Sequence, residues 1–142
     1  MITQLMIGSA TILATMAVLI AFVGLSMPML RSLEKTVSMK GFPRRRFFVV
    51  LSGTVLLILA ANTLCVWIWA LLFRFLAVFA SLEEAVYFSM VSFTTVGYGD
   101  VVVNQDWRVL SGFVAVNGLL AFGIFTAFLI EMMHKVSRSL RD

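Results

Sequence analysis

The segment TTVGYGD, from Thr94 to Asp100, is the least ordinary part of this sequence. Two glycines flank a tyrosine, two threonines precede them, and an aspartate closes the segment. Glycine adopts backbone angles that are closed to other residues. The segment therefore suits either a tight turn or a backbone-lined site for bare ions, and the flanking sequence has to distinguish them.

The composition indicates an integral membrane protein. Of the 142 residues, 61% are hydrophobic and 13% are charged, whereas a soluble domain is about 45–50% apolar and about 25% charged. The net charge of +4 does not indicate nucleic-acid binding, because the basic residues lie beside apolar segments. The sequence has no zinc-ligand spacing, no nucleotide-binding glycine loop and no catalytic triad pattern, so we expect no enzymatic activity and no catalytic residues.

Three uncharged runs are long enough to cross a bilayer. They are Leu5–Leu30, Phe47–Phe73 and Val109–Ile130. A run of about 22 residues forms a helix of about 33 Å, and the bilayer core is about 30 Å thick. A fourth uncharged run, Ala85–Gly99, is too short to cross and contains most of the glycine-rich segment. A short apolar segment between two full spans is typical of a re-entrant loop.

The charges predict the orientation of these spans. The linker Arg31–Arg46 is strongly basic, and basic residues also follow the third run, whereas acids outnumber arginines between Arg74 and Arg108. The positive-inside rule then places the linker and the C-terminus in the cytoplasm, with the N-terminus and the glycine-rich segment outside. Leu33 and Val37 share one face of the linker. The linker could therefore lie on anionic lipids, or its charges could serve only to set the topology.

The first apolar run is predicted to be a packing helix. It carries Ala10, Ala14, Ala17 and Ala21 at the small-xxx-small spacing that suits contact between membrane helices. It has no regularly spaced arginines, so it is no voltage sensor. A regulatory role is the second interpretation of this helix.

The residues before the glycine-rich segment predict a short helix. Ser81 and Glu84 have the spacing of a capping box, which predicts a helix over Leu82–Phe93. Its carbonyl end, with roughly half a negative charge, would point toward the membrane centre and favour a cation there. The returning strand could not face lipid with unpaired backbone groups, so it must line a space enclosed by protein.

In this setting the segment Thr94–Asp100 resembles the selectivity-filter signature of the potassium channel pore-domain family. The resemblance covers an outer helix, a pore helix, the filter and an inner helix, from about Phe47 to His134. It implies a homotetramer around one pore, in which rings of carbonyls replace the water shell of K⁺ ions. No cofactor other than these filter ions is implied.

The resemblance also implies roles for individual residues. The K⁺ ligands are the carbonyls of Thr95, Val96, Gly97 and Tyr98, with the Thr95 hydroxyl. Filter support comes from Thr94, Gly99, Asp100, Tyr87 and Ser92, with Tyr87 able to donate to Asp100 and Ser92 to Tyr98. Gly118 occupies the hinge position of the inner helix, and Thr126, Ile130 and His134 lie on its pore face.

Two of these roles have a simpler alternative, and some family features are missing. Gly118 also suits a close-packing site, and His134 also suits a side chain at the lipid headgroups.

Phe88 stands where the family has the second residue of a tryptophan pair, and Val91 replaces a buried acid. These differences affect the expected rigidity of the filter more than its selectivity.

The sequence therefore predicts an all-α membrane protein with three transmembrane helices, a re-entrant pore helix and a filter. The expected parts are a transmembrane helix (1–30), a basic cytoplasmic linker (31–46), a pore domain (47–134) and a short cytoplasmic tail (135–142). The predicted function is passive, K⁺-selective conduction across the cell membrane by four chains. The alternatives are a subunit of a potassium uptake transporter or of a hetero-oligomeric channel.

Overall fold

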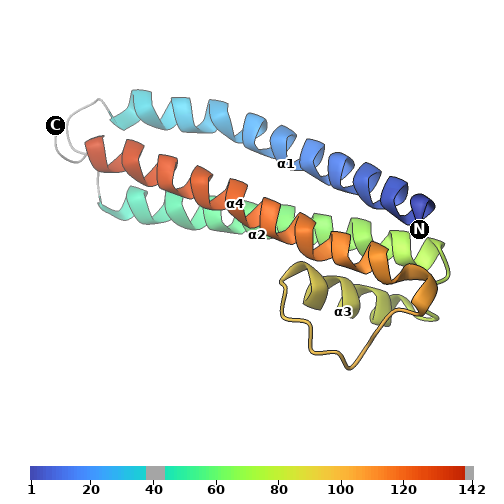
Figure 1. Ribbon diagram of the computed structural model, residues 1–142. Coiled ribbons are helices and arrows are strands. Elements are labelled where there is room, and N and C mark those ends of the chain that lie inside the picture. Colours follow the sequence, from blue (N-terminus) through green and yellow to red (C-terminus); the bar gives the residue numbers. More distant parts are fainter. Residues whose placement is uncertain (38–43, 140–142) are drawn as a thin grey trace.

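The chain folds into three long helices and one short helix (Figure 1). The computed structural model describes the backbone of residues 1–37 and 44–139, and side chains mainly over residues 1–24 and 51–134. The elements are α1 (Ile2–Val37), α2 (Arg44–Phe75), α3 (Leu82–Phe93), the 3-10 turn η1 (Gln105–Trp107) and α4 (Arg108–Ser139). The described part of the chain contains no strand, so the all-α prediction is confirmed.

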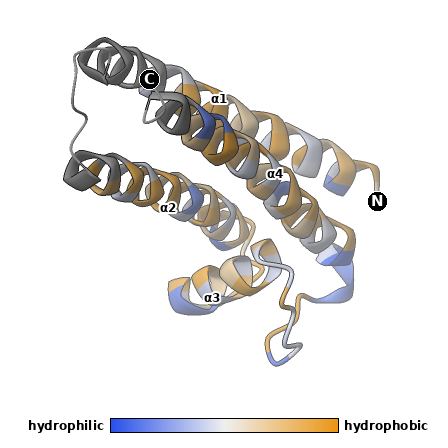
Figure 2. Cartoon of the chain, turned by 90° about the vertical axis from the view of Figure 1, so that its left-hand side faces the viewer, coloured by the Kyte–Doolittle hydropathy of each residue, from blue (hydrophilic) through white to orange (hydrophobic). Residues whose placement is uncertain are grey.

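The three long helices lie side by side, and α3 packs at one end of them. Helices α1 and α4 run in the same direction and α2 runs against them, so that α1 begins, α2 ends and α4 begins at the end where α3 lies (Figure 1). Apolar residues dominate all three long helices (Figure 2). The stretches Ile2–Gly24, Leu51–Phe75 and Gln105–His134 are each long and apolar enough to cross a membrane.

The helices are longer than the uncharged runs that predict them. Helix α1 continues past Leu30 to Val37, α2 begins at Arg44, and α4 continues to Ser139. Much of the predicted linker and tail is therefore helical. The reason is that arginine, lysine and glutamate are good helix formers, so a helix need not stop where its apolar segment ends. The predicted lipid-facing side chains of the linker lie outside the described residues.

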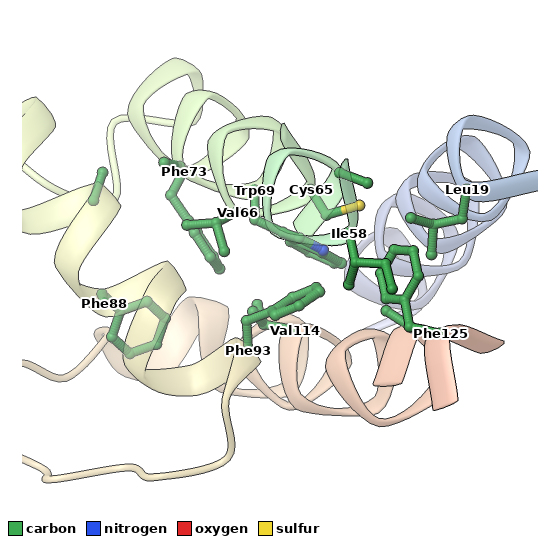
Figure 3. Close-up of a cluster of buried hydrophobic side chains, with 14 of the residues drawn as sticks. Leu19, Ile58, Cys65, Val66, Trp69, Phe73, Phe88, Phe93, Val114 and Phe125 are labelled. Carbon is green, nitrogen blue, oxygen red and sulfur yellow. The ribbon is translucent and has the colours of Figure 1, made fainter. Parts of the chain in front are cut away.

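An aromatic cluster fixes α3 against its neighbours. The ring of Phe88 lies 5.4 Å from that of Phe73 on α2 and 5.0 Å from that of Phe79. At the other end of α3, the ring of Phe93 lies 6.0 Å from that of Phe122 on α4. Phe88 and Phe93 both point into the buried core between the helices (Figure 3). Phe88 therefore anchors α3 by packing.

Helix α1 packs on α4 through a face other than the one with the regularly spaced alanines. All four alanines of the small-xxx-small pattern are exposed. Among the residues of α1 whose burial the structure describes, the buried ones are instead Gly8, Thr15, Leu19 and Ser26, and Leu19 points toward Phe125 of α4 (Figure 3). The face of α1 with Thr15 and Leu19, and not the alanine face, therefore meets α4 within one chain. Contact of the alanine face with another membrane helix stays a prediction, because spacing alone does not say which partner a face meets.

Candidate ion-binding site

The short helix α3 begins with the predicted cap. Ser81 has an extended backbone, and its Oγ accepts a hydrogen bond of 3.1 Å from the N–H of Glu84. This bond satisfies one of the N–H groups that a helix leaves without an internal acceptor. The helix then runs from Leu82 to Phe93, and both predicted ends are confirmed.

At the other end of α3, the chain folds back on the helix through its N–H groups. The N–H of Thr94 donates to the carbonyl of Met90, and that of Thr95 donates to Ser92. The N–H groups of Val96 and Gly97 both donate to the carbonyl of Val91, at 3.1 and 3.3 Å. The donors of this turn are therefore directed at α3.

The carbonyls of the same residues are left open. Within the described ranges, no backbone or side-chain donor bonds to the carbonyl oxygens of Thr95, Val96, Gly97 or Tyr98. Carbonyl oxygens without a protein donor need water or a cation as their partner. These four residues are the K⁺ ligands that the family resemblance implies.

The backbone of this segment alternates in handedness. Thr95, Gly97 and Gly99 have φ values of +61°, +56° and +76°, whereas Val96 and Tyr98 between them do not have positive φ. Such alternation aims successive peptide groups in the same direction. A positive φ at a non-glycine residue such as Thr95 costs of order 1–3 kcal/mol and occurs mostly at functional sites. The sequence predicts unusual angles for the two glycines but gives no signal for Thr95.

Two side chains of the segment find no cover within the chain. Val96 is 53% exposed and Tyr98 is 72% exposed. In a single copy, the described residues therefore leave these two side chains largely uncovered. The suggested bond from Ser92 to Tyr98 is not formed in the part of the chain that the structure describes.

The C-terminal end of the segment is bonded to α3 by a hydrogen bond. The hydroxyl of Tyr87 donates to Oδ2 of Asp100 at 2.6 Å, as the sequence allows, and Oδ1 of Asp100 accepts from the N–H of Val101 at 3.0 Å. Donation from Tyr87 lowers the pKa of Asp100, and the same bond raises the pKa of Tyr87. At neutral pH the aspartate is therefore ionised and can accept both bonds.

The end of α3, directly before the segment, lies against α4 at Gly118. A Cβ at this position would lie 1.8 Å from the carbonyl oxygen of Phe93 and 2.8 Å from its carbonyl carbon. Helix α4 continues without a break through Gly118. The close approach of two backbones requires a glycine here, which supports the packing interpretation. A hinge role stays a prediction.

The three residues predicted to line the inner pore lie on an uncovered face of α4. Thr126, Ile130 and His134 are all exposed, and the hydroxyl of Thr126 donates to the carbonyl of Phe122 in its own helix. In the described ranges, no group of three or more His, Cys, Asp or Glu residues could hold a metal ion.

The short helix α3 and the open carbonyls that follow it lie within a region that matches a known protein family. A family model described as "Ion channel" matches residues 47–135. The chain belongs to this ion channel family, and with its three long apolar helices it is a membrane protein. Comparison with curated proteins and with solved structures found no match. Helix α1 precedes the matched region.

Proposed function

We propose that the protein is a potassium-selective channel that conducts K⁺ passively through a pore shared by four identical chains. The observation that carries this proposal is the run of open carbonyls from Thr95 to Tyr98, on a backbone of alternating φ. Each chain supplies one such run, and a ring of carbonyls around an ion needs several runs about one axis.

The exposed side chains of the segment support assembly. Val96 and Tyr98 are uncovered in one copy, and large apolar groups beside a backbone site are expected to find a packing partner. In the proposed tetramer these side chains pack between the carbonyl runs and neighbouring copies, which holds the rings at a fixed width. Thr94, Gly99 and the bond between Tyr87 and Asp100 then serve as filter support.

The proposed membrane arrangement follows from the charges and the fold. The N-terminus and the carbonyl run lie on the outer side, and the basic segment after α1 and the end of α4 lie in the cytoplasm. In this arrangement α3 enters from outside, and its carbonyl end points inward. In the proposed channel, the exposed face of α4 that carries Thr126 and Ile130 lines the inner pore.

A flux assay on purified protein tests this function. The full chain is reconstituted in liposomes, and uptake of Rb⁺ is compared with that of Na⁺ and Li⁺, while native mass spectrometry counts the chains. We expect tetramers that pass K⁺ and Rb⁺ far better than Na⁺ and Li⁺. Comparable Na⁺ uptake would exclude a selective filter. Absence of all uptake would favour a subunit of a transporter or of a hetero-oligomeric channel.

A further inference from the structure

Helix α1 lies before the matched channel domain and yet is bonded to it by polar side chains. Oε1 of Gln4 accepts a hydrogen bond of 3.1 Å from the N–H of Leu110, which lies in the first turn of α4. The first N–H groups of a helix have no acceptor within it. Gln4 therefore caps α4 from a neighbouring helix and fixes where α4 begins relative to α1.

Close packing continues from this cap along both helices. A Cβ at Gly8 would lie 2.6 Å from the ring of Phe113, so the two helices approach closely there. Farther along, the rings of Phe22 and Phe125 meet edge to face with their centroids 6.4 Å apart. Since the two helices run in parallel, these contacts hold α4 over several turns.

The centre of the contact is a buried polar pair. Thr15 and Asn117 are both fully buried, and Oγ1 of Thr15 lies 3.1 Å from Oδ1 of Asn117. The same hydroxyl lies within hydrogen-bond distance of the carbonyls of Thr11 and Ile12, but a hydroxyl has only one hydrogen to donate.

The amide of Asn117 depends on Thr15 in either of its orientations. Its Nδ2 has no hydrogen-bond partner when Oδ1 faces Thr15. A half-turn of the amide brings Nδ2 opposite the hydroxyl, which is then free to donate to the carbonyl of Ile12. In both cases Thr15 is the side chain that bonds to Asn117. An amide without a partner is costly in an apolar interior.

This pair adjoins the inner end of the carbonyl run. Asn117 precedes Gly118, whose Cα touches the backbone of Phe93 so closely that a Cβ would not fit. Phe93 is the last residue of α3, and the open carbonyls begin two residues later, at Thr95. A continuous set of contacts therefore leads from Thr15 through α4 to the base of the carbonyl run.

We propose that α1 is a positioning element for ion selectivity. Thr15, through Asn117, holds α4 against the end of α3, and this contact keeps the inner end of the carbonyl run at a fixed distance from the pore axis. The inference rests on the proposed function, because it assigns Thr15 and Asn117 as positioning residues for that same site.

A double-mutant cycle on the full chain tests the proposal. Thr15→Val removes the hydroxyl and leaves the Asn117 amide without a partner, and Asn117→Leu removes the amide. The double variant removes both polar groups. Thr15→Ser keeps the hydroxyl. Thr11→Val is the matched control, because its hydroxyl bonds only to the carbonyl of Ile7 in its own helix. The thermal midpoint in detergent and the Rb⁺/Na⁺ uptake ratio in liposomes are measured for each protein.

We expect Thr15→Val to lower the midpoint and to lower the Rb⁺/Na⁺ ratio by about fivefold, the size of effect that one interhelical hydrogen bond has on an equilibrium. Thr15→Ser and Thr11→Val should behave like the parent, and the double variant should recover most of both losses. A lower midpoint with an unchanged ratio would overturn the proposal, since Thr15 would then be merely structural. The proposal would also be overturned if the effects of the two single substitutions simply added in the double variant. If the parent itself does not distinguish Rb⁺ from Na⁺, the proposed function fails. The thermal midpoints of the variants still show in that case whether Thr15 and Asn117 are bonded.

Discussion

The hydroxyl of Tyr87 on α3 and the carboxylate of Asp100 are joined by a hydrogen bond of 2.6 Å beside the C-terminal end of the carbonyl run. Tyr87 lies before the segment Thr94–Asp100 in the sequence, and Asp100 ends it. The bond therefore closes a loop that contains the whole carbonyl run. In the proposed channel it restrains the filter on the side where ions enter from outside.

Tyr87→Phe should remove this restraint and leave the fold intact. We expect the variant to keep its K⁺ selectivity but to lose current several times faster during sustained opening in a planar bilayer, because the outer end of the filter is free to move. Tyr87→Trp is the matched variant, since its indole N–H can replace the donor. Identical decay in the parent and in Tyr87→Phe would show that the bond does not restrain the filter.

The lowered pKa of Asp100 fixes the pH range over which the bond with Tyr87 keeps its full strength. Because donation from Tyr87 lowers the pKa of Asp100, the ionised form is favoured in the folded protein. Its contribution is therefore complete at neutral pH and is lost only as the pH falls through the lowered pKa. We expect the current decay of the parent to be constant from about pH 8 to about pH 5. A marked change within that range would mean that another group controls the decay.

Gly99→Ala tests the backbone geometry of the carbonyl run. The φ of +76° at this residue is one that an alanine adopts only with strain, of order 1–3 kcal/mol in each chain. We expect loss of selective Rb⁺ uptake with the helices still inserted, as judged by circular dichroism of the reconstituted protein. Gly112→Ala is the control, because Gly112 lies in α4 with open space around its Cβ position and without positive φ. Selective uptake by Gly99→Ala would contradict the proposed filter.

His134→Gln tests which environment surrounds the exposed end of α4. If His134 lines the cytoplasmic mouth of the pore, exchange of its imidazole for an amide should change the rate of Rb⁺ uptake by the reconstituted protein. Equal uptake by the parent and by His134→Gln would place the histidine at the lipid headgroups instead. Substitution at Met133, which is also exposed on α4, controls for general effects.

Much of the site could be predicted because its signals are local. The pair Ser81 and Glu84 starts α3, and the glycines mark where the backbone needs unusual angles. The contact between α1 and α4 is different, because a repeated small residue fits lipid, another copy or another helix equally well. A better signal lay in Gln4 and Thr15: a polar side chain within a membrane span needs a partner. Nothing in the sequence, however, identifies Leu110 and Asn117 as the partners, since they lie far away in the chain.

Gly118→Ala distinguishes the two interpretations of this glycine. The added Cβ would meet the carbonyl of Phe93 at 1.8 Å, and a backbone atom cannot turn aside as a flexible side chain can. Helix α4 and the end of α3 must separate, and overpacking of this kind costs typically about 1–3 kcal/mol. We expect a lower thermal midpoint in detergent, fewer intact tetramers and a reduced Rb⁺/Na⁺ uptake ratio.

Gly123→Ala is the matched control for this substitution. Gly123 lies in the same helix with nothing within 4 Å of its Cβ position, so the same change in helix flexibility occurs there without a clash. Removal of a glycine from a helix interior stabilises the helix by roughly 0.5–1 kcal/mol, so this variant should be at least as stable as the parent. A pure hinge at position 118 predicts the opposite pattern for Gly118→Ala: an unchanged midpoint and ion ratio, with altered opening. That result would mean that the close contact between Gly118 and Phe93 has no role in the filter. The proposed coupling of Thr15 to the carbonyl run would then fail as well, because it depends on this contact.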